Sequence, residues 1–328
     1  MKYIKKAIRI LRVFMATRQE RRKKKNLPLI AKWSSPSIPP AENKGTRITW
    51  IGHSTFLIQI DSVNIITDPI FFDLPMGLKR LLPPGIPLKH LPKIDVVLIS
   101  HNHRDHMDEQ SLTRLKEDNP SILVPHGNKK WFDKRNFYNV HEYKWQKREQ
   151  ITFRETTITL SFLPAKHWSC RTPLDLNASE WGSWMIEHKN KKIYFTGDSG
   201  ASPLFEKIGN QFKEIDVALM PLGPIEPRSL MKASHMSPQE SIDAFISLKA
   251  KQFIPMHWGT YQTGCDEFEE PILQLTQAWQ KRSKELCSKK LHIIKCGGQV
   301  EPFVEFTFIP AVKAKSFGQQ SIPDQKQL

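Results

Sequence analysis

The sequence predicts an α/β fold, in which two mixed β-sheets form a sandwich with helices on its outer faces. Short runs rich in β-branched and aromatic residues come first as hairpins and later alternate with helical patterns. Several of these apolar runs end directly in histidine or aspartate, which is where a sandwich can gather a site. The chain has 328 residues, of which 39% are hydrophobic and 25% charged, as in ordinary globular proteins.

The expected strands follow one another along most of the chain. The apolar and β-branched runs that predict them are 47–51, 55–60, 63–67, 94–100, 121–125, 151–163, 183–187, 191–196, 215–220, 252–256 and 291–296. The clearest helix covers 237–249, where Ser237 can cap the first turn, Pro238 takes the first helical position and Glu240 completes a capping box. No repeat of 20–50 residues is visible.

We expect one globular domain between two unlike ends. Residues 1–42 form a basic amphipathic segment and a Pro-rich linker, 43–310 the globular domain, and 311–328 a polar tail. Residues 1–25 contain eleven Lys or Arg and one acidic residue. They therefore contribute most of the formal net charge of +16. Their apolar residues recur at helical spacing, which suits the surface of an anionic membrane. The alternative is a helix that packs on its own domain.

The localisation expected from these features is cytoplasmic, with peripheral membrane association. Cations interrupt the apolar N-terminal positions and no small-residue cleavage site follows, which argues against a secretory signal. No apolar run approaches the roughly 18 residues that cross a bilayer. The four cysteines, Cys170, Cys265, Cys287 and Cys296, are widely spaced and fit reduced thiols. The sequence leaves the oligomeric state open, a dimer included.

The segment with the strongest chemical signal begins at the end of an apolar strand. Three histidines and an aspartate, His101, His103, Asp105 and His106, follow it within six residues in the pattern HxHxDH. So many polar side chains cannot be ordinary core residues, because each would need a partner. His101 and His103, two apart on an extended chain, can bind one ion, while Asp105 and His106 can serve a second. Such nitrogen and oxygen ligands suit Zn²⁺, with Fe or Mn as alternatives.

Three further strand ends each deliver a residue of the metal-ligand type. They are His167 after a strand, Asp198 in a Gly-Asp pair and His257 before Trp258. Together with HxHxDH they follow the order of the metallo-β-lactamase superfamily, which the chain resembles. It looks more specifically like the N-acyl-phosphatidylethanolamine-hydrolysing phospholipase D branch. The stretches that carry this resemblance are 50–55, 98–108, 164–169, 224–228, 231–235 and 257–260.

The resemblance implies a αββα sandwich and a two-metal site. One ion would be held by His101, His103 and His167, the other by Asp105, His106 and His257, with Asp198 as the bridge. A metal-bound hydroxide would attack the phosphorus of a phospholipid, and the bond to the alcohol headgroup would break to leave phosphatidate. The candidate catalytic residues are Asp105, Asp198 and His235.

Other residues are candidates for supporting roles. By the same resemblance, Asp68 would order the metal loop through hydrogen bonds and would not be a ligand. His235 could contact the phosphate or assist departure of the headgroup. His53, Trp168 and Trp258 could touch the substrate, although the tryptophans suit core packing better, since Trp is highly buried on average.

Three other functions compete with a lipid phosphodiesterase. The same site could act on a soluble phosphodiester or a sugar-phosphate lactone. A nuclease is the second alternative, but only 58 residues separate Asp198 from His257. That spacing leaves no room for the large inserted domain of the superfamily's RNA-processing nucleases, so we do not expect nucleic acid as a partner. A membrane scaffold with purely structural metals fits poorly, because a structural site is normally closed by four ligands.

Overall fold

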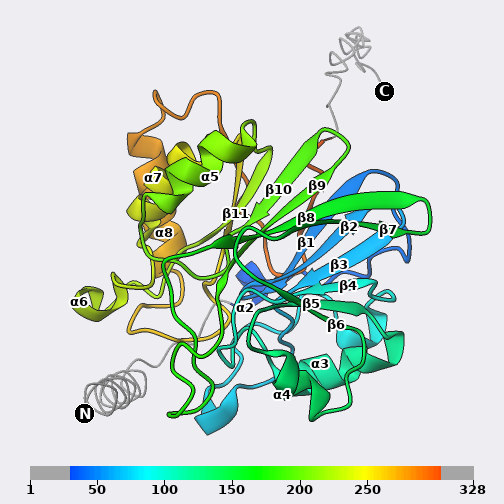
Figure 1. The fold of residues 1–328 in the computed structure, drawn as a ribbon. Helices are drawn as coiled ribbons and strands as arrows, with labels where there is room; N and C mark the ends of the chain where they lie inside the picture. The colour runs from blue at the N-terminus through cyan, green and yellow to red at the C-terminus, as the bar shows by residue number, and fades with distance from the viewer. Residues whose placement is uncertain (1–29, 304–328) are drawn as a thin grey trace, which may run out of the picture.

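The protein is described by a computed structural model that covers residues 30–303. The predicted basic N-terminal helix and the polar segment 311–328 lie outside the described residues. Within them, two seven-stranded sheets face each other, with helices on the outer faces (Figure 1). The predicted sandwich of two mixed sheets flanked by helices is confirmed.

The first sheet has the strand order β14-β1-β2-β3-β4-β5-β6. Its β14, β1, β2 and β3 pair antiparallel, and the strands from β3 to β6 pair parallel. The strands are β1 Thr46–Gly52, β2 Thr55–Ile60, β3 Val63–Thr67, β4 Val96–Leu98, β5 Ser121–Pro125, β6 Val140–Tyr143 and β14 Gln299–Val300.

The second sheet has the order β13-β12-β11-β10-β9-β8-β7. Here β7 to β10 pair antiparallel, and β10 to β13 pair parallel. The strands are β7 Arg148–Phe153, β8 Thr156–Pro164, β9 Gly182–His188, β10 Lys191–Phe195, β11 Val217–Pro221, β12 Gln252–Met256 and β13 Lys290–Leu291.

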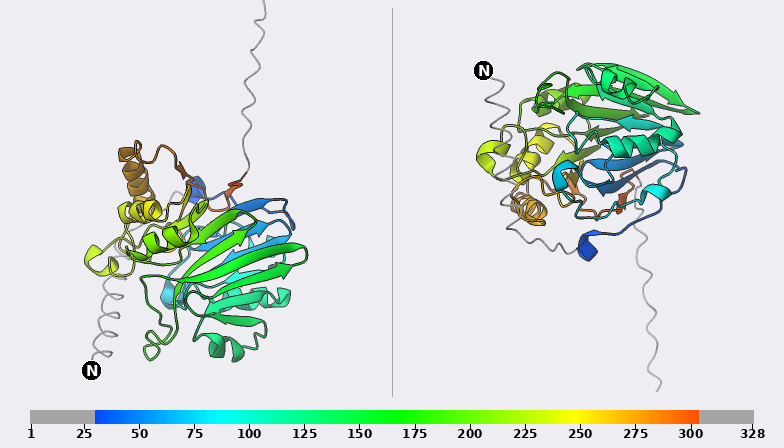
Figure 2. Two further views of the ribbon diagram at one scale, coloured as in Figure 1. Left: turned by 45° about the horizontal axis from the view of Figure 1, so that its top comes forward. Right: turned by 90° about the horizontal axis from the view of Figure 1, so that it is seen from below.

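Helices cover each sheet on the side away from the other sheet, as two views show (Figure 1, Figure 2). The α-helices are α2 Ile30–Trp33, α3 Glu109–Leu115, α4 Lys129–Asp133, α5 Leu204–Phe212, α6 Arg228–Met231, α7 Pro238–Ser247 and α8 Glu270–Lys281, and the 3-10 turns are η1 Pro75–Gly77, η2 Leu88–His90 and η3 Lys116–Asp118. The capping box predicted at α7 is present, because Ser237 and Glu240 each accept a backbone N–H of the other.

Side-chain alternation along the strands divides the core into two parts. In β2, Phe56 and Ile58 belong to the large cluster between the sheets, which also takes in residues of α5, α7 and α8. Leu57 points the other way, into a cluster with Leu112 of α3 and Phe132 of α4. This two-residue period lets one strand serve both layers, which explains why β2 is buried along its whole length.

The predicted strand 151–163 is wrong as a single element. It is a hairpin of β7 and β8, in which Phe153 pairs with Thr156. The two turn residues, Arg154 and Glu155, carry none of the usual Gly or Asn signals, although Arg154 adopts the left-handed conformation with φ 52°. The run of β-branched residues on both sides hides the turn from sequence reasoning.

The predicted strand 291–296 is also wrong beyond its first residue. Pairing with β12 lasts for two residues, Lys290 and Leu291, and the chain then leaves the second sheet. Gly297 N donates to Trp50 O at 2.7 Å, which brings the chain to the edge of the first sheet, where β14 forms. Cys296 belongs to the large core cluster, and Ile293 and Ile294 pack against it. Sequence reasoning missed both β14 and β6.

The site lies where strand ends from both sheets meet. Strands β3 and β4 run parallel in one sheet, and β10 and β12 share a direction in the other. The loops after these strands reach the same edge, which is where ligands bind in parallel sheets. Gly197, just after β10, allows a close approach, because an added β-carbon there would lie 2.6 Å from Ser100 Cβ.

Candidate metal centre

Three imidazoles form the first group of potential ligands. His101 and His103 lie on the loop after β4, and His167 follows β8. His101 Nε2 is 2.8 Å from His103 Nδ1, and His103 Nδ1 is 3.2 Å from His167 Nε2. All three nitrogens therefore point at one small volume that could hold a cation.

The second group combines imidazoles with a carboxylate. Asp105 Oδ2 lies 3.5 Å from His106 Nε2 and 3.8 Å from His257 Nε2, and the two imidazole nitrogens are 3.3 Å apart. Asp105 and His106 come from the loop after β4, whereas His257 comes from the end of β12 in the other sheet. Like the first group, which takes His167 from the second sheet, this group exists only because the two sheets meet here.

Asp198 lies between the two groups. Its Oδ1 is 3.2 Å from His257 Nε2, and its Oδ2 is 3.3 Å from His106 Nε2 and 3.9 Å from His167 Nε2. The side chain is 2% exposed, and Oδ1 has no hydrogen-bond partner among the described residues. A carboxylate that faces donors of both groups can bridge two cations.

Hydrogen bonds on the outer side hold the rings in place. Nδ1 of His101 is 2.9 Å from Ser100 Oγ, and Nδ1 of His167 donates to Ser234 O at 3.0 Å. Nδ1 of His106 pairs with Asp68 Oδ2 at 2.7 Å. In each case Nε2 is left facing the site, which is the arrangement that second-sphere partners impose on metal-binding histidines.

The spacing of the donor atoms fits bound metal ions. Ligand bonds of roughly 2.0–2.2 Å in tetrahedral geometry place neighbouring ligand atoms roughly 3.3 Å apart. Separations inside the two groups run from 2.8 to 3.8 Å. Histidine nitrogens that face one another cannot all act as hydrogen-bond donors, so a cation is the partner that satisfies them together.

Burial changes the pKa values of three histidines in the site. It lowers the pKa of His53 and His235 to about 3 and that of His167 to about 4. At neutral pH these imidazoles are therefore uncharged and carry a free lone pair. Neutral imidazole is the form that binds a metal.

The carboxylates of the site remain ionised despite their burial. Burial by itself would raise the pKa of Asp198, but His106 and His257 outweigh it and hold this pKa well below its usual range. Burial would likewise lower the pKa of His106, yet Asp198 and Asp105 hold it well above the usual value. The buried carboxylates thus need positive charge close by, which a divalent cation supplies.

Asp68 lies behind the loop after β4 and is fully buried. It accepts hydrogen bonds from Ser100 N at 2.7 Å and Ser100 Oγ at 2.6 Å, and it holds His106 as described above. Its backbone φ of 33° is unusual for a residue with a β-carbon. The structure thus gives Asp68 contacts to the loop that carries the donors.

Both supporting histidines predicted from the sequence lie at the site. His235, between α6 and α7, places Nδ1 3.7 Å from Asp198 Oδ2, and within the described part of the chain that nitrogen has no hydrogen-bond partner. His53, in the turn between β1 and β2, is 1% exposed and places Nε2 3.1 Å from Asp105 Oδ2. The two rings thus lie near different groups.

The two predicted tryptophan contacts have different surroundings. Trp168 packs edge-on against His103 with ring centroids 4.2 Å apart, so it borders the first group. Trp258 is 2% exposed, stacks on Trp50 and meets the edge of Trp33. Its ring belongs mainly to the core, although it also lines the pocket beside His257.

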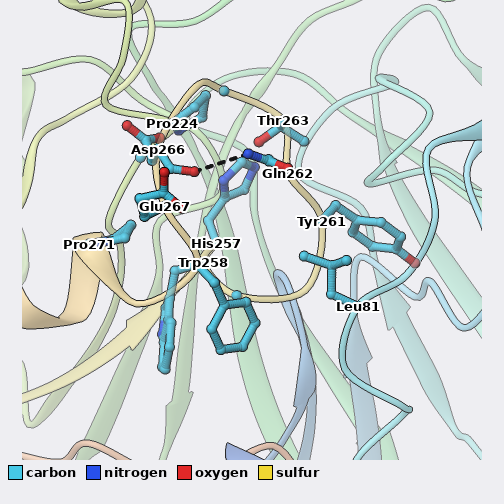
Figure 3. A pocket seen from close by; sticks show the side chains of 14 residues that line it. Leu81, Pro224, His257, Trp258, Tyr261, Gln262, Thr263, Asp266, Glu267 and Pro271 are labelled. Atoms are coloured by element: carbon cyan, nitrogen blue, oxygen red, sulfur yellow. Dashed lines mark hydrogen bonds between the residues drawn. The ribbon is translucent and has the colours of Figure 1, made fainter. Parts of the chain in front are cut away.

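That pocket adjoins the second group. It opens to solvent and holds only about 30 Å³ of space that a water-sized molecule can reach, and Tyr261 and Leu81 lie on one side of it (Figure 3). Asp266 lies across from them, where its carboxylate accepts the backbone N–H groups of Ile225 and Glu226 at 2.8 Å. Burial raises the pKa of Asp266 to about 6. The metal centre therefore has an adjoining space of mixed polarity.

Sequence reasoning missed the residues that hold the site from outside. Ser100, next to His101, bonds to both His101 and Asp68, and its position directly before the motif was the available signal. Thr260 accepts the backbone N–H of His53 at 2.6 Å. The carbonyl of Ser234, which orients His167, leaves no signal in the sequence because any residue carries one.

Known proteins resemble the chain in both sequence and fold. A family model described as the beta-lactamase superfamily domain matches residues 63–258. N-acyl-phosphatidylethanolamine-hydrolyzing phospholipase D 1 of Caenorhabditis elegans is 35% identical over 237 residues, which cover 68% of this chain and 67% of that protein. The mitochondrial enzyme of the same description from Saccharomyces cerevisiae is 35% identical over 258 residues. These residues make up 74% of this chain but only about half of the yeast protein, 55%.

Solved structures support the fold. The crystal structure of a possible metal-dependent hydrolase from Veillonella parvula aligns with a TM-score of 0.62 at 16% identity. The alignment covers 79% of this chain and 100% of that one. With donors, fold and sequence in agreement, the chain belongs to the metallo-β-lactamase superfamily, among its metal-dependent hydrolases related to N-acyl-phosphatidylethanolamine-hydrolysing phospholipase D.

Proposed function

We propose that the protein is a two-metal phosphodiesterase that cleaves N-acyl-phosphatidylethanolamine-like phospholipids to phosphatidate. The observation that carries this proposal is the pair of donor groups joined by Asp198, together with relatives named for that reaction. The donor set favours Zn²⁺, with Fe or Mn as alternatives. His101, His103 and His167 would hold one ion, and Asp105, His106 and His257 the other.

Two such ions would lower the pKa of water toward neutrality and neutralise charge on the phosphoryl oxygens. In the reaction, the oxygen of water bonds to phosphorus and the P–O bond to the headgroup alcohol breaks. The leaving headgroup oxygen takes a proton, so the products are phosphatidate and the N-acylated amino alcohol.

His235 is the residue best placed to accept a proton from the attacking water and pass it to the leaving headgroup oxygen, because its imidazole is uncharged at neutral pH. Its Nδ1 lies 3.7 Å from Asp198 Oδ2 and has no hydrogen-bond partner among residues 30–303, and its side chain is 14% exposed. A substrate oxygen that enters beside Asp198 would come within reach of this nitrogen. The role of Asp198 is then to orient both the donor groups and His235 around the phosphate.

The pocket beside His257 adjoins the metal centre and opens to solvent, so a substrate held at the metals could extend across its mouth. Leu81, Pro224 and Tyr261 offer apolar surface, while Thr263 lies on the same rim (Figure 3). A headgroup that carries both an amide and a hydrocarbon chain has this mixed character. We therefore place the N-acylated headgroup there.

The basic N-terminal segment would bring the enzyme to its substrate. Eleven basic residues against one acid in 1–25 complement an anionic membrane. Among residues 30–303, no helix has the length and apolar character that a membrane crossing requires. Deletion of residues 1–25 should weaken binding to anionic vesicles while activity on a short-chain soluble phospholipid persists. Equal sedimentation of both proteins with vesicles would contradict this role.

The decisive experiment is phosphatidate release from mixed phospholipid vesicles, with metal content measured on the same samples. We expect release by the wild type with about two metal ions per chain. Asp198→Asn should release none. A wild type that holds two ions but releases no phosphatidate would overturn the lipid substrate and direct attention to soluble phosphodiesters and sugar-phosphate lactones.

A further inference from the structure

His53 is a buried histidine with a single polar contact at its ring. The residue is 1% exposed, and Nε2 lies 3.1 Å from Asp105 Oδ2. Its Nδ1 has no hydrogen-bond partner among the described residues. A structural histidine normally finds partners for its ring nitrogens when buried. Here the one contact is a carboxylate that already faces the metal centre.

The backbone fixes this ring in place at a conformational cost. His53 adopts φ 54°, and His257 adopts φ 60°, in the left-handed region that residues with a β-carbon avoid. His257 N donates to His53 O at 3.1 Å, and Trp50 Nε1 donates to the same oxygen at 3.0 Å. The two histidines are therefore tied to each other through the main chain. Strained residues held by several bonds are typical of functional sites.

The donor atoms of His53, Asp105, His106 and His257 form one compact cluster. All four lie within 4.8 Å of one another, as do those of the three-histidine group. The rings of His53 and His257 are 4.0 Å apart between centroids.

We propose that His53 is a direct ligand of the ion held by Asp105, His106 and His257. The proposal rests on the metal part of the proposed function and adds a ligand that the seven-residue pattern does not contain. The ion at His53 would then have four protein ligands in addition to Asp198. The other ion would have the three imidazoles of the first group. Four protein ligands close a site, whereas three leave a position open. We therefore expect the ion at His53 to be bound more firmly, and the three-histidine ion to meet the substrate.

A matched pair of variants separates a ligand from a hydrogen-bond donor. The terminal atoms of Glu and Gln reach about as far from the backbone as Nε2 of His53. Both side chains also have the same conformational free-energy cost at φ 54°. Glu can bind a metal but cannot donate to Asp105, whereas Gln can donate but binds metals poorly. Metal content after dialysis against a chelator, and Co²⁺ titration followed by visible absorption, report on binding without any activity assay.

If His53 is a ligand, His53→Gln should retain about one ion under conditions in which the wild type retains two. We expect the affinity for the ion at His53 to fall by about 100-fold in His53→Gln. The loss of a direct ligand should weaken metal binding at least as much as the loss of an outer hydrogen-bond partner. His53→Glu should keep two ions and show an altered Co²⁺ spectrum. His141→Gln, at an exposed position on β6, is the control and should match the wild type.

The opposite pattern would overturn the proposal. If His53 only donates to Asp105, Gln would keep both ions and Glu would lose one through repulsion between the two carboxylates. If both variants retained two ions equally, His53 would also not be a metal ligand. A wild type that binds no metal at all would instead overturn the proposed function, and His53 as a ligand with it. Circular dichroism of each variant checks that the fold is intact.

Discussion

The two donor groups of the metal centre share one plan but differ in backbone conformation. Each takes two residues from the loop after β4 and one histidine from the second sheet, His167 after β8 in the first group and His257 after β12 in the second. No member of the first group has a positive φ, whereas His257 and its neighbour His53 are both in the left-handed conformation. Both groups therefore depend on the meeting of the two sheets, but only the second is held by backbone in an unfavourable conformation. We expect the two groups to respond differently to substitution.

The largest effect should come from Asp198, which is shared by both groups. Asp198→Asn keeps the shape but removes the charge that faces His106 and His257. We expect loss of both ions and a decrease in phosphatidate release of about 10³-fold or more, since several kcal/mol of charge stabilisation disappear. Metal analysis and vesicle hydrolysis measure the two losses. Retention of one ion would show that the groups are independent.

His235 tests the role of a residue beside the first group. His235→Gln should lower kcat by about 10²-fold, the usual scale for a lost proton-transfer residue, while the metal content stays at two. Full activity would remove His235 from the mechanism. Loss of an ion would instead make it a ligand, since it also clusters with His167 and Asp198.

Asp68 should affect the second group more than the first. It holds His106 directly, whereas its link to His101 passes through Ser100. Asp68→Asn should lower the binding affinity for the ion of the second group about tenfold. This is the lower end of the range for losing an outer hydrogen-bond partner of a metal ligand. In a competition titration with a chelator, one of the two ions should be removed at a lower chelator concentration than in the wild type. Equal displacement of both ions would contradict the difference drawn between the groups.

The smallest effect concerns Asp266, in the pocket beside the second group. Its pKa of about 6 in the folded protein lies above the usual value of about 3.9. Between these pH values the folded protein keeps a proton that the unfolded chain releases, so this residue's contribution to stability falls as pH rises. Asp266→Asn should lack that fall. Urea unfolding of both proteins at pH 4.5 and 7 measures it, and parallel changes would contradict the assignment.

The sequence predicted much of the fold where strands are short, apolar and bounded by polar turns. The expected bounds 55–60, 63–67, 121–125 and 252–256 agree with β2, β3, β5 and β12. The strand predictions failed where a turn lacks Gly or Asn, as at Arg154. They also failed where a mostly apolar run leaves one sheet for the other, as at 293–296. In both cases local composition favours a strand and only pairing partners decide otherwise.

By itself, the sequence determined which side chains could bind metal, because three histidines and an aspartate in six residues after an apolar strand require partners that a core cannot supply. The tertiary structure decided how they are grouped. Asp198 and His257 come from the sheet opposite the HxHxDH loop, and a few ångströms between strand ends set which donors share a space. It also placed His53 beside Asp105, a contact across 52 residues of chain. Sequence spacing fixes neighbours along one strand, but only the packing of two sheets fixes neighbours across them.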